Sequence, residues 1–180
     1  QLGALGLGCG GISKLIPSLP TGCAKITDIE HVVILTQENR SFDHYFGSYR
    51  GVRGFSDQSA AFQQPDSANT TISPVGKLLP FHLDTAQVNA ACTHDISHDW
   101  VPQHQSWDNG KMDGFVNSRL LINSNDAVLT MGYYTRADLP YYYALADGFT
   151  LCDNYFCSVM GPTDPNRLYL YEGRPGTGKT

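Results

Sequence analysis

The chain has 180 residues, of which 16% are charged and 41% are hydrophobic, and its formal net charge at pH 7 is −5. This length suits one domain with one buried core, and the composition argues against a disordered chain and against a coiled coil. The twelve basic residues form no run, so no nucleic-acid partner is expected, and five cysteines are too few for a disulfide scaffold.

The first thirteen residues, QLGALGLGCGGIS, are uncharged and rich in leucine and glycine. They are too short to span a bilayer, which requires about 20 apolar residues. They are similar to the end of the apolar part of a signal peptide, and a flexible, glycine-rich N-terminus is the alternative. We expect residues 1–25 to be one or the other. Because the chain also stops at Thr180 without a closing element, both ends look interrupted.

The hydrophobic pattern between the ends is typical of an α/β protein. Residues 31–36 (HVVILT) are β-branched and apolar, as in a buried strand of a parallel sheet. Ser41 can cap a short helix that ends at Gly47. Residues 56–77 are rich in Ser, Gln, Asn, Asp and Pro, so they predict a surface loop.

The second half of the chain continues this alternation. Residues 84–103 are dense in His and Asp, and residues 107–114 (WDNGKMDG) predict a turn. Residues 139–147 predict a helix, residues 149–156 predict a returning strand, and a last helix is expected to begin near Pro165.

Polar residues follow both predicted strands, which is where open α/β sheets bind ligands. After the first strand, Glu38 offers a carboxylate and Asn39 an amide oxygen, and such hard oxygens suit a divalent cation. An ion pair between Glu38 and a nearby arginine is the alternative. After the second strand, Thr163 has a hydroxyl at the expected start of a helix, where backbone N–H groups favour phosphate. An ordinary N-cap is the alternative there.

Histidines are concentrated just before the predicted turn. His94 and His98 are four residues apart, and with Asp95, Asp99 and His104 they are compatible with a second metal site. A hydrogen-bonded cluster is the alternative.

Two other histidines are expected to be structural. His31 precedes a predicted buried strand, and His44 lies among aromatic residues of a predicted helix. Cys152 and Cys157 lie on the predicted returning strand at an odd spacing, so their side chains point to opposite faces and are expected to be separate thiols.

Five sequence blocks follow one another in a recognisable order. They are DIEHVVIL followed by QENRSFDHYFG, then SHDW, NGKMDGF and GPTDPNR. Together they resemble the bacterial, mycobacterial-type phospholipases C of the phosphoesterase family, relatives of acid phosphatase A in the alkaline-phosphatase-like superfamily. The resemblance implies an α/β fold, namely an alkaline-phosphatase-like sandwich with a central, mostly parallel sheet that is incomplete in this chain. Residues 26–172 would form the N-terminal part of the phosphoesterase domain.

The resemblance also implies roles for individual residues. The Glu-Asn pair of the family binds the active-site metal, which assigns Glu38 and Asn39 to a divalent metal ion of unknown identity. The hydroxyl of the Gly-Pro-Thr block is the nucleophile, which assigns Thr163, and the metal would contact this hydroxyl and lower its pKa. The family block assigns His98 as the active-site imidazole. Arg167 faces the phosphate or supports the fold.

The implied activity is hydrolysis of phosphatidylcholine at a membrane surface to diacylglycerol and phosphocholine, by an exported protein that is secreted or associated with the cell wall. Tyrosines at 133, 134 and 141–143 are available to hold a choline cation, or they belong to the core. A phosphomonoesterase like the acid phosphatases and a non-catalytic remnant are the alternatives. Family members run to several hundred residues and carry further Asp and His ligands after this region, so this fragment alone is expected to be inactive.

One motif competes with this interpretation. Residues from Gly173 to Thr180 fit the pattern G-x-x-x-x-G-K-[ST] of a phosphate-binding loop. The helix and the acidic magnesium ligand that this loop needs do not follow within the sequence. We therefore expect no nucleotide binding and treat residues 173–180 as a tail outside the family likeness.

Overall fold

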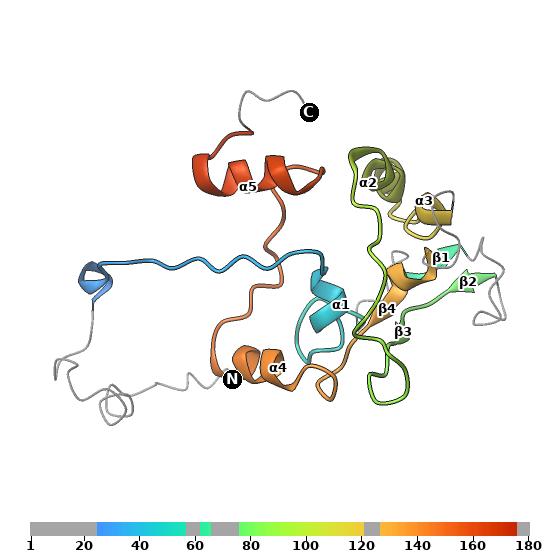
Figure 1. Ribbon diagram of the computed structural model, residues 1–180, viewed down its shortest axis with the longest axis horizontal. Helices are drawn as coiled ribbons and strands as arrows, with labels where there is room; N and C mark the ends of the chain where they lie inside the picture. Colours follow the sequence, from blue (N-terminus) through green and yellow to red (C-terminus); the bar gives the residue numbers. More distant parts are fainter. Residues whose placement is uncertain (1–24, 57–61, 66–75, 121–126, 176–180) are drawn as a thin grey trace. The chain divides into compact units, whose positions relative to one another are not determined.

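The computed structural model describes residues 25–56, 62–65, 76–120 and 127–175 (Figure 1). The chain divides into two units, Gln1–Asn39 and Arg40–Thr180. The segment expected to be related to a signal peptide, residues 1–13, lies outside the described residues, as do residues 176–180 of the loop-like motif.

The first unit contains one turn of 3-10 helix, η1 (Ile26–Asp28), followed by an extended segment (Figure 1). The prediction of a buried strand at residues 31–36 is wrong in this structure, because Val33 is 91% exposed and Leu35 is 84% exposed. A strand is stable only when a neighbour takes up its backbone hydrogen bonds. The sheets of the described residues include no strand that pairs with this segment.

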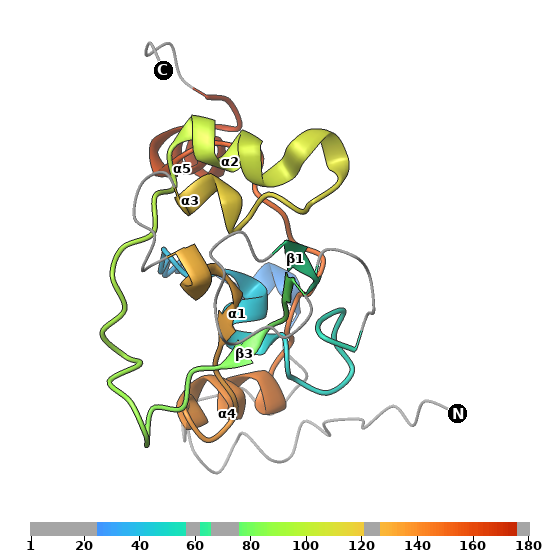
Figure 2. The same cartoon turned by 90° about the vertical axis from the view of Figure 1, so that its right-hand side faces the viewer.

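In the second unit, α1 (Phe42–Phe46) confirms the predicted short helix. The Ser41 hydroxyl accepts a hydrogen bond from the His44 amide at 3.2 Å, and Gly47 is the C-cap. The helix lies beside a parallel pair of strands, β3 (Phe81–His82) and β4 (Gly132–Tyr133) (Figures 1 and 2).

The His44 ring is a structural contact in this arrangement, as predicted. The ring Nδ1 donates to the Gly132 carbonyl at 2.7 Å. The backbone carbonyl of His44 accepts from the Tyr134 amide at 2.8 Å. Burial lowers the pKa of His44 because it disfavours the charged ring. His31, in contrast, is exposed, because the strand that was expected to bury it does not form.

A second sheet pairs β1 (Gln64–Pro65) with β2 (Lys77–Leu78) in antiparallel register. The loop predicted for residues 56–77 is therefore interrupted at Gln64, which is completely buried. Its amide oxygen accepts from the Phe115 amide at 2.9 Å and its nitrogen donates to the Met112 carbonyl at 2.8 Å. A buried amide with both ends paired carries little penalty, which explains why so polar a stretch contributes to the interior.

The helices of the middle of the chain are α2 (Trp100–Trp107), η3 (Asp108–Gly110), α3 (Asn117–Leu120) and η4 (Ala127–Met131), and α2 packs against α3 (Figure 2). Among the described residues, two apolar clusters form the core. One consists of Leu78, Val116, Ala127 and Met131, and the other of Leu83, Ala90 and Tyr134.

Near the C-terminus, α4 (Pro140–Gly148) and α5 (Thr163–Glu172) confirm the two predicted helices. The strand predicted at residues 149–156 is wrong, since no strand is assigned there and Phe149 and Phe156 are 78% and 74% exposed. Cys152 and Cys157 are free and exposed, as expected, although the strand used to argue this is absent.

The described residues therefore combine helices with two two-stranded sheets, which is compatible with an α/β protein. The expected sandwich around a central sheet is not confirmed. None of the described helices is both long enough and apolar enough to cross a lipid bilayer.

Candidate active site

Thr163 is the first residue of α5, a ten-residue helix. The cap position before it is occupied by Pro162, and no side chain caps the helix start. The alternative that Thr163 is an ordinary N-cap therefore does not hold. The Thr163 side chain is half-buried. Its hydroxyl lies in the first turn of the helix, where the backbone N–H groups have no intrahelical partner.

The turn before Thr163 is held by Asn166, a residue that the sequence interpretation did not single out. The Asn166 side-chain nitrogen lies 3.1 Å from each of the carbonyl oxygens of Val159, Gly161 and Pro162, and its two N–H groups are shared among these three acceptors. Its oxygen accepts from the Val159 amide at 3.2 Å.

The same turn packs against the start of α2. Gly161 is buried, and a Cβ added to it would lie 3.1 Å and 3.2 Å from two ring atoms of Trp100. The Trp100 ring stacks on His104 with ring centroids 4.2 Å apart, and His104 Nδ1 donates to the Trp100 carbonyl at 2.9 Å. Two of the recognised blocks, GPTDPNR and SHDW, are thus brought into contact.

His98 lies two residues before Trp100 in the chain. Its side chain is 47% exposed, and its Nδ1 lies 3.8 Å from Asp95 Oδ1 and donates to the Ile96 carbonyl at 3.3 Å. The His98 carbonyl accepts a short hydrogen bond from Gln103.

The second metal site considered for this histidine-rich stretch does not form. Across the residues that the structure describes, no group of three or more His, Cys, Asp or Glu side chains is arranged to hold a metal ion. The contacts of His98, and the hydrogen bond of 3.0 Å between Ser97 and Asp99, correspond to the hydrogen-bonded cluster that was the alternative.

Glu38 and Asn39 end the first unit, whereas Thr163 belongs to the second. Asn39 has a φ of 66°, in the left-handed region that asparagine tolerates better than most residues. The carboxylate and the amide oxygen are hard donors of the kind that a divalent cation selects, but such an ion takes about six oxygens. The pair therefore fits part of a metal site.

Arg167 follows Thr163 by four residues in α5, so the two occupy the same face of the helix. The tyrosines considered for choline are divided between core and surface. Tyr134 and Tyr143 are buried, at 4% and 2% exposure, whereas Tyr141 is 69% exposed. The buried pair belongs to the core.

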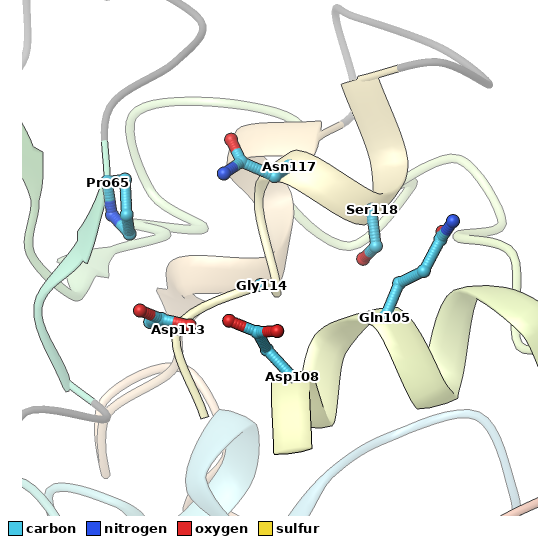
Figure 3. Close-up of a pocket in the computed structure, with 7 residues that line it drawn as sticks. All are labelled: Pro65, Gln105, Asp108, Asp113, Gly114, Asn117 and Ser118. Atoms are coloured by element: carbon cyan, nitrogen blue, oxygen red, sulfur yellow. The ribbon is translucent and has the colours of Figure 1, made fainter. Parts of the chain in front are cut away.

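A separate hollow of about 320 Å³ is lined by Asp113 and Gly114 of the NGKMDGF block, by Asp108 just before it, and by Pro65, Gln105, Asn117 and Ser118 (Figure 3). The carboxylates of Asp108 and Asp113 point toward one another across it. Lys111 Nζ donates to Asp108 Oδ2 at 3.0 Å, and this hydrogen bond lowers the pKa of Asp108. A side-chain hydrogen bond with Asp113 lowers that pKa further. Asp108 and Asn109 both have positive φ, which is why this sequence forms the predicted turn.

Gly114 in this block cannot be replaced without moving the backbone, because an added Cβ would collide with the Gln105 carbonyl oxygen. The Gly114 amide donates to the Ser106 carbonyl at 3.3 Å and its carbonyl accepts from the Ser118 amide at 2.9 Å. The glycine therefore allows the close approach of α2 and α3.

Comparison with known proteins shows which family the sequence matches. The phosphoesterase family matches residues 29–180. Phospholipase C A of Mycobacterium tuberculosis is 46% identical over 150 residues, which cover 80% of this chain and 29% of that protein. Phospholipase C B of the same species is 44% identical over 153 residues, with the same coverage. Hemolytic phospholipase C of Pseudomonas aeruginosa is 45% identical over 166 residues, which are 91% of this chain and 22% of that protein. The chain thus spans less than a third of the length of these relatives.

Proposed function

The chain belongs to the phosphoesterase family, and we propose that it supplies part of the active site of a phospholipase C that hydrolyses phosphatidylcholine to diacylglycerol and phosphocholine. The observation that carries the proposal is the position of Thr163, in the first turn of α5 and next to the Trp100 junction, in a chain 44–46% identical to three relatives named phospholipase C. The protein is proposed to be exported and to meet its substrate at a membrane surface.

The chemistry proposed for this chain begins with attack of Thr163 Oγ1 on phosphorus. A bond forms between that oxygen and phosphorus, the bond from phosphorus to the glycerol oxygen breaks, and diacylglycerol leaves with a proton. His98 is the group proposed to supply that proton, while the Thr163 hydroxyl gives up its own proton to solvent as it attacks. Water then attacks the phosphocholine–threonine ester as His98 takes up one of the water's protons, the bond from phosphorus to Thr163 Oγ1 breaks, phosphocholine leaves, and Thr163 Oγ1 regains a proton from solvent. The free N–H groups at the start of α5 favour the negative phosphate oxygens.

Glu38, Asn39 and Thr163 are the residues of this chain that we propose to hold a divalent metal ion. When bound, such an ion lowers the pKa of a hydroxyl and offsets negative charge on a phosphoryl group. Glu38 contributes the only negative charge among these three side chains, so its carboxylate is expected to dominate the affinity of this partial ligand set.

The experiment uses the complete protein that contains this chain. Activity is measured on phosphatidylcholine vesicles and on a phosphomonoester, for wild type and for Thr163→Val and Thr163→Ser. The proposal requires Thr163→Val to lose activity by several orders of magnitude while Thr163→Ser retains an appreciable part, because only the latter keeps the attacking oxygen. Preference for the phosphomonoester would replace the phospholipase proposal by that of a phosphatase.

A further inference from the structure

The backbone that presents Thr163 is fixed from both sides. On one side, Gly161 is packed against the Trp100 ring. On the other side, the Asn166 side chain makes four hydrogen bonds to the backbone of residues 159–162.

The geometry of these bonds shows what Asn166 restrains. Its NH₂ group faces three carbonyls, those of Val159, Gly161 and Pro162, and the last of these belongs to the residue directly before Thr163. Asn166 itself lies in the first turn of α5, three residues after Thr163. One side chain therefore links the residues before Thr163 to the helix that follows it, and Thr163 lies between the two attachment points.

We propose that Asn166 is a positioning residue for the nucleophilic hydroxyl of Thr163, an inference that rests on the proposed function. Asn166 keeps the peptide carbonyls on the loop side of the turn and leaves the helix N–H groups open toward the phosphate. An in-line attack tolerates little displacement of the reacting oxygen, and a shift of about 1 Å can lower a rate by about 10²-fold. The same hydrogen bonds in a purely structural role would contribute to stability and leave turnover unaffected.

The test compares three substitutions in the complete protein. Asn166→Asp keeps the size and the accepting oxygen, but it turns three attractive contacts into repulsion between oxygens. Asn166→Ala removes all four hydrogen bonds. Asn166→Gln keeps the amide and displaces it by one methylene, so it is the variant most suited to fold. Asn154→Asp, at an exposed residue of the preceding loop, is the matched control.

We expect kcat for phosphatidylcholine to fall by about 10²-fold in the Asn166 variants that fold, with KM changed by less than about threefold. The single-turnover rate of ester formation on Thr163 should fall in parallel, whereas Asn154→Asp should match wild type. A fall in the thermal midpoint alone, with kcat per folded molecule within about threefold of the control in Asn166→Gln, would overturn the proposal.

Thr163→Val, measured in the same assay, separates the two levels of inference. If Thr163→Val turns over at the wild-type rate, the proposed function fails and Asn166 has no nucleophile to position. If Thr163→Val is inactive and the Asn166 variants keep wild-type kcat, only the positioning role is wrong. Loss of kcat in both sets, with KM retained in the Asn166 variants, supports both.

Discussion

Asp138 joins two segments of the second unit, residues 82–85 and residues 135–138, and its replacement by asparagine should destabilise that unit. The carboxylate is 3% exposed and accepts five hydrogen bonds. Oδ1 accepts from the amide and the hydroxyl of Thr85, both at 2.9 Å. Oδ2 accepts from the amide of Thr135 at 2.8 Å, from its hydroxyl at 2.7 Å and from His82 Nε2 at 2.7 Å. Burial opposes ionisation, but the hydrogen bonds outweigh it and hold the pKa of Asp138 far below its ordinary value.

The size of the expected loss of stability follows from the backbone amides of Thr85 and Thr135, whose positions are fixed. In Asp138→Asn, the new NH₂ group must face either the Thr85 amide or the Thr135 amide, and a backbone N–H cannot turn away. One charge-assisted hydrogen bond is then lost and one backbone N–H is left without its acceptor, each at about 1–3 kcal/mol. We therefore expect the free energy of unfolding to fall by about 2–6 kcal/mol.

Asp147→Asn is the matched control, because it makes the same change at a carboxylate that is 47% exposed. Asp147 pairs with Arg136 at 2.6 Å, and hydrogen bonds from Arg136 and Tyr49 lower the pKa of Asp147 to about 2. Water can replace these partners, so the expected loss is at most about 1 kcal/mol.

Urea unfolding of the two variants, with hydrogen exchange of the Thr85 and Thr135 amides, measures the difference. Because folding depresses the pKa of Asp138, its contribution to stability is fully present above its unfolded pKa of about 3.9 and is lost as the pH falls below that value. Asp138→Asn should lack this part of the acid dependence. Equal losses of stability in Asp138→Asn and Asp147→Asn, or unchanged exchange at both amides, would refute the reasoning.

Two further substitutions test the site, both in the complete protein. Gly161→Ala places a methyl group 3.1 Å from the Trp100 ring and should lower kcat by at least about tenfold, as measured by steady-state kinetics. Gly148→Ala is the control, because its methyl group meets nothing within 4 Å, and it should leave kcat unchanged. Equal kcat in these two variants would contradict the coupling of the turn to α2. Glu38→Gln keeps the shape and removes the charge, so metal titration after chelation should show an affinity lower by at least about tenfold, and Glu30→Gln, exposed in the same unit, should show no change. An unaltered titration for Glu38→Gln would exclude Glu38 as a ligand.

Elements that depend on local signals were predictable from the sequence, and elements that depend on partners were not. Ser41 and Gly47 define α1 through their own caps, and Pro140 marks the first turn of α4, so these helices need no distant residue. A strand needs a neighbour for its backbone groups. The apolar runs at 31–36 and 149–156 satisfy the sequence pattern of a strand, yet no strand is assigned to either of them.

The candidate site divides in the same way. The Gly-Pro-Thr turn and the following helix place Thr163 in a first helical turn, which the sequence predicts. An asparagine three residues later was a signal that could have been read, because asparagine side chains bond readily to nearby backbone, and here the side chain bonds to the Pro162 carbonyl just before α5. The contact between Gly161 and Trp100 was not accessible, because it joins residues far apart in the chain and depends on how α2 is packed.

The central claim is that Thr163 forms a covalent ester during hydrolysis of phosphatidylcholine, and acid quenching with mass spectrometry tests it most directly. The complete protein is mixed with phosphatidylcholine vesicles, quenched during turnover, and digested. We predict a phosphocholine ester on the peptide that contains Thr163, present in wild type and in the exposed-site control Thr150→Val and missing in an inactive Thr163→Val protein. A phosphocholine ester on a different residue, or a folded Thr163→Val protein that hydrolyses phosphatidylcholine at the wild-type rate, would contradict the claim.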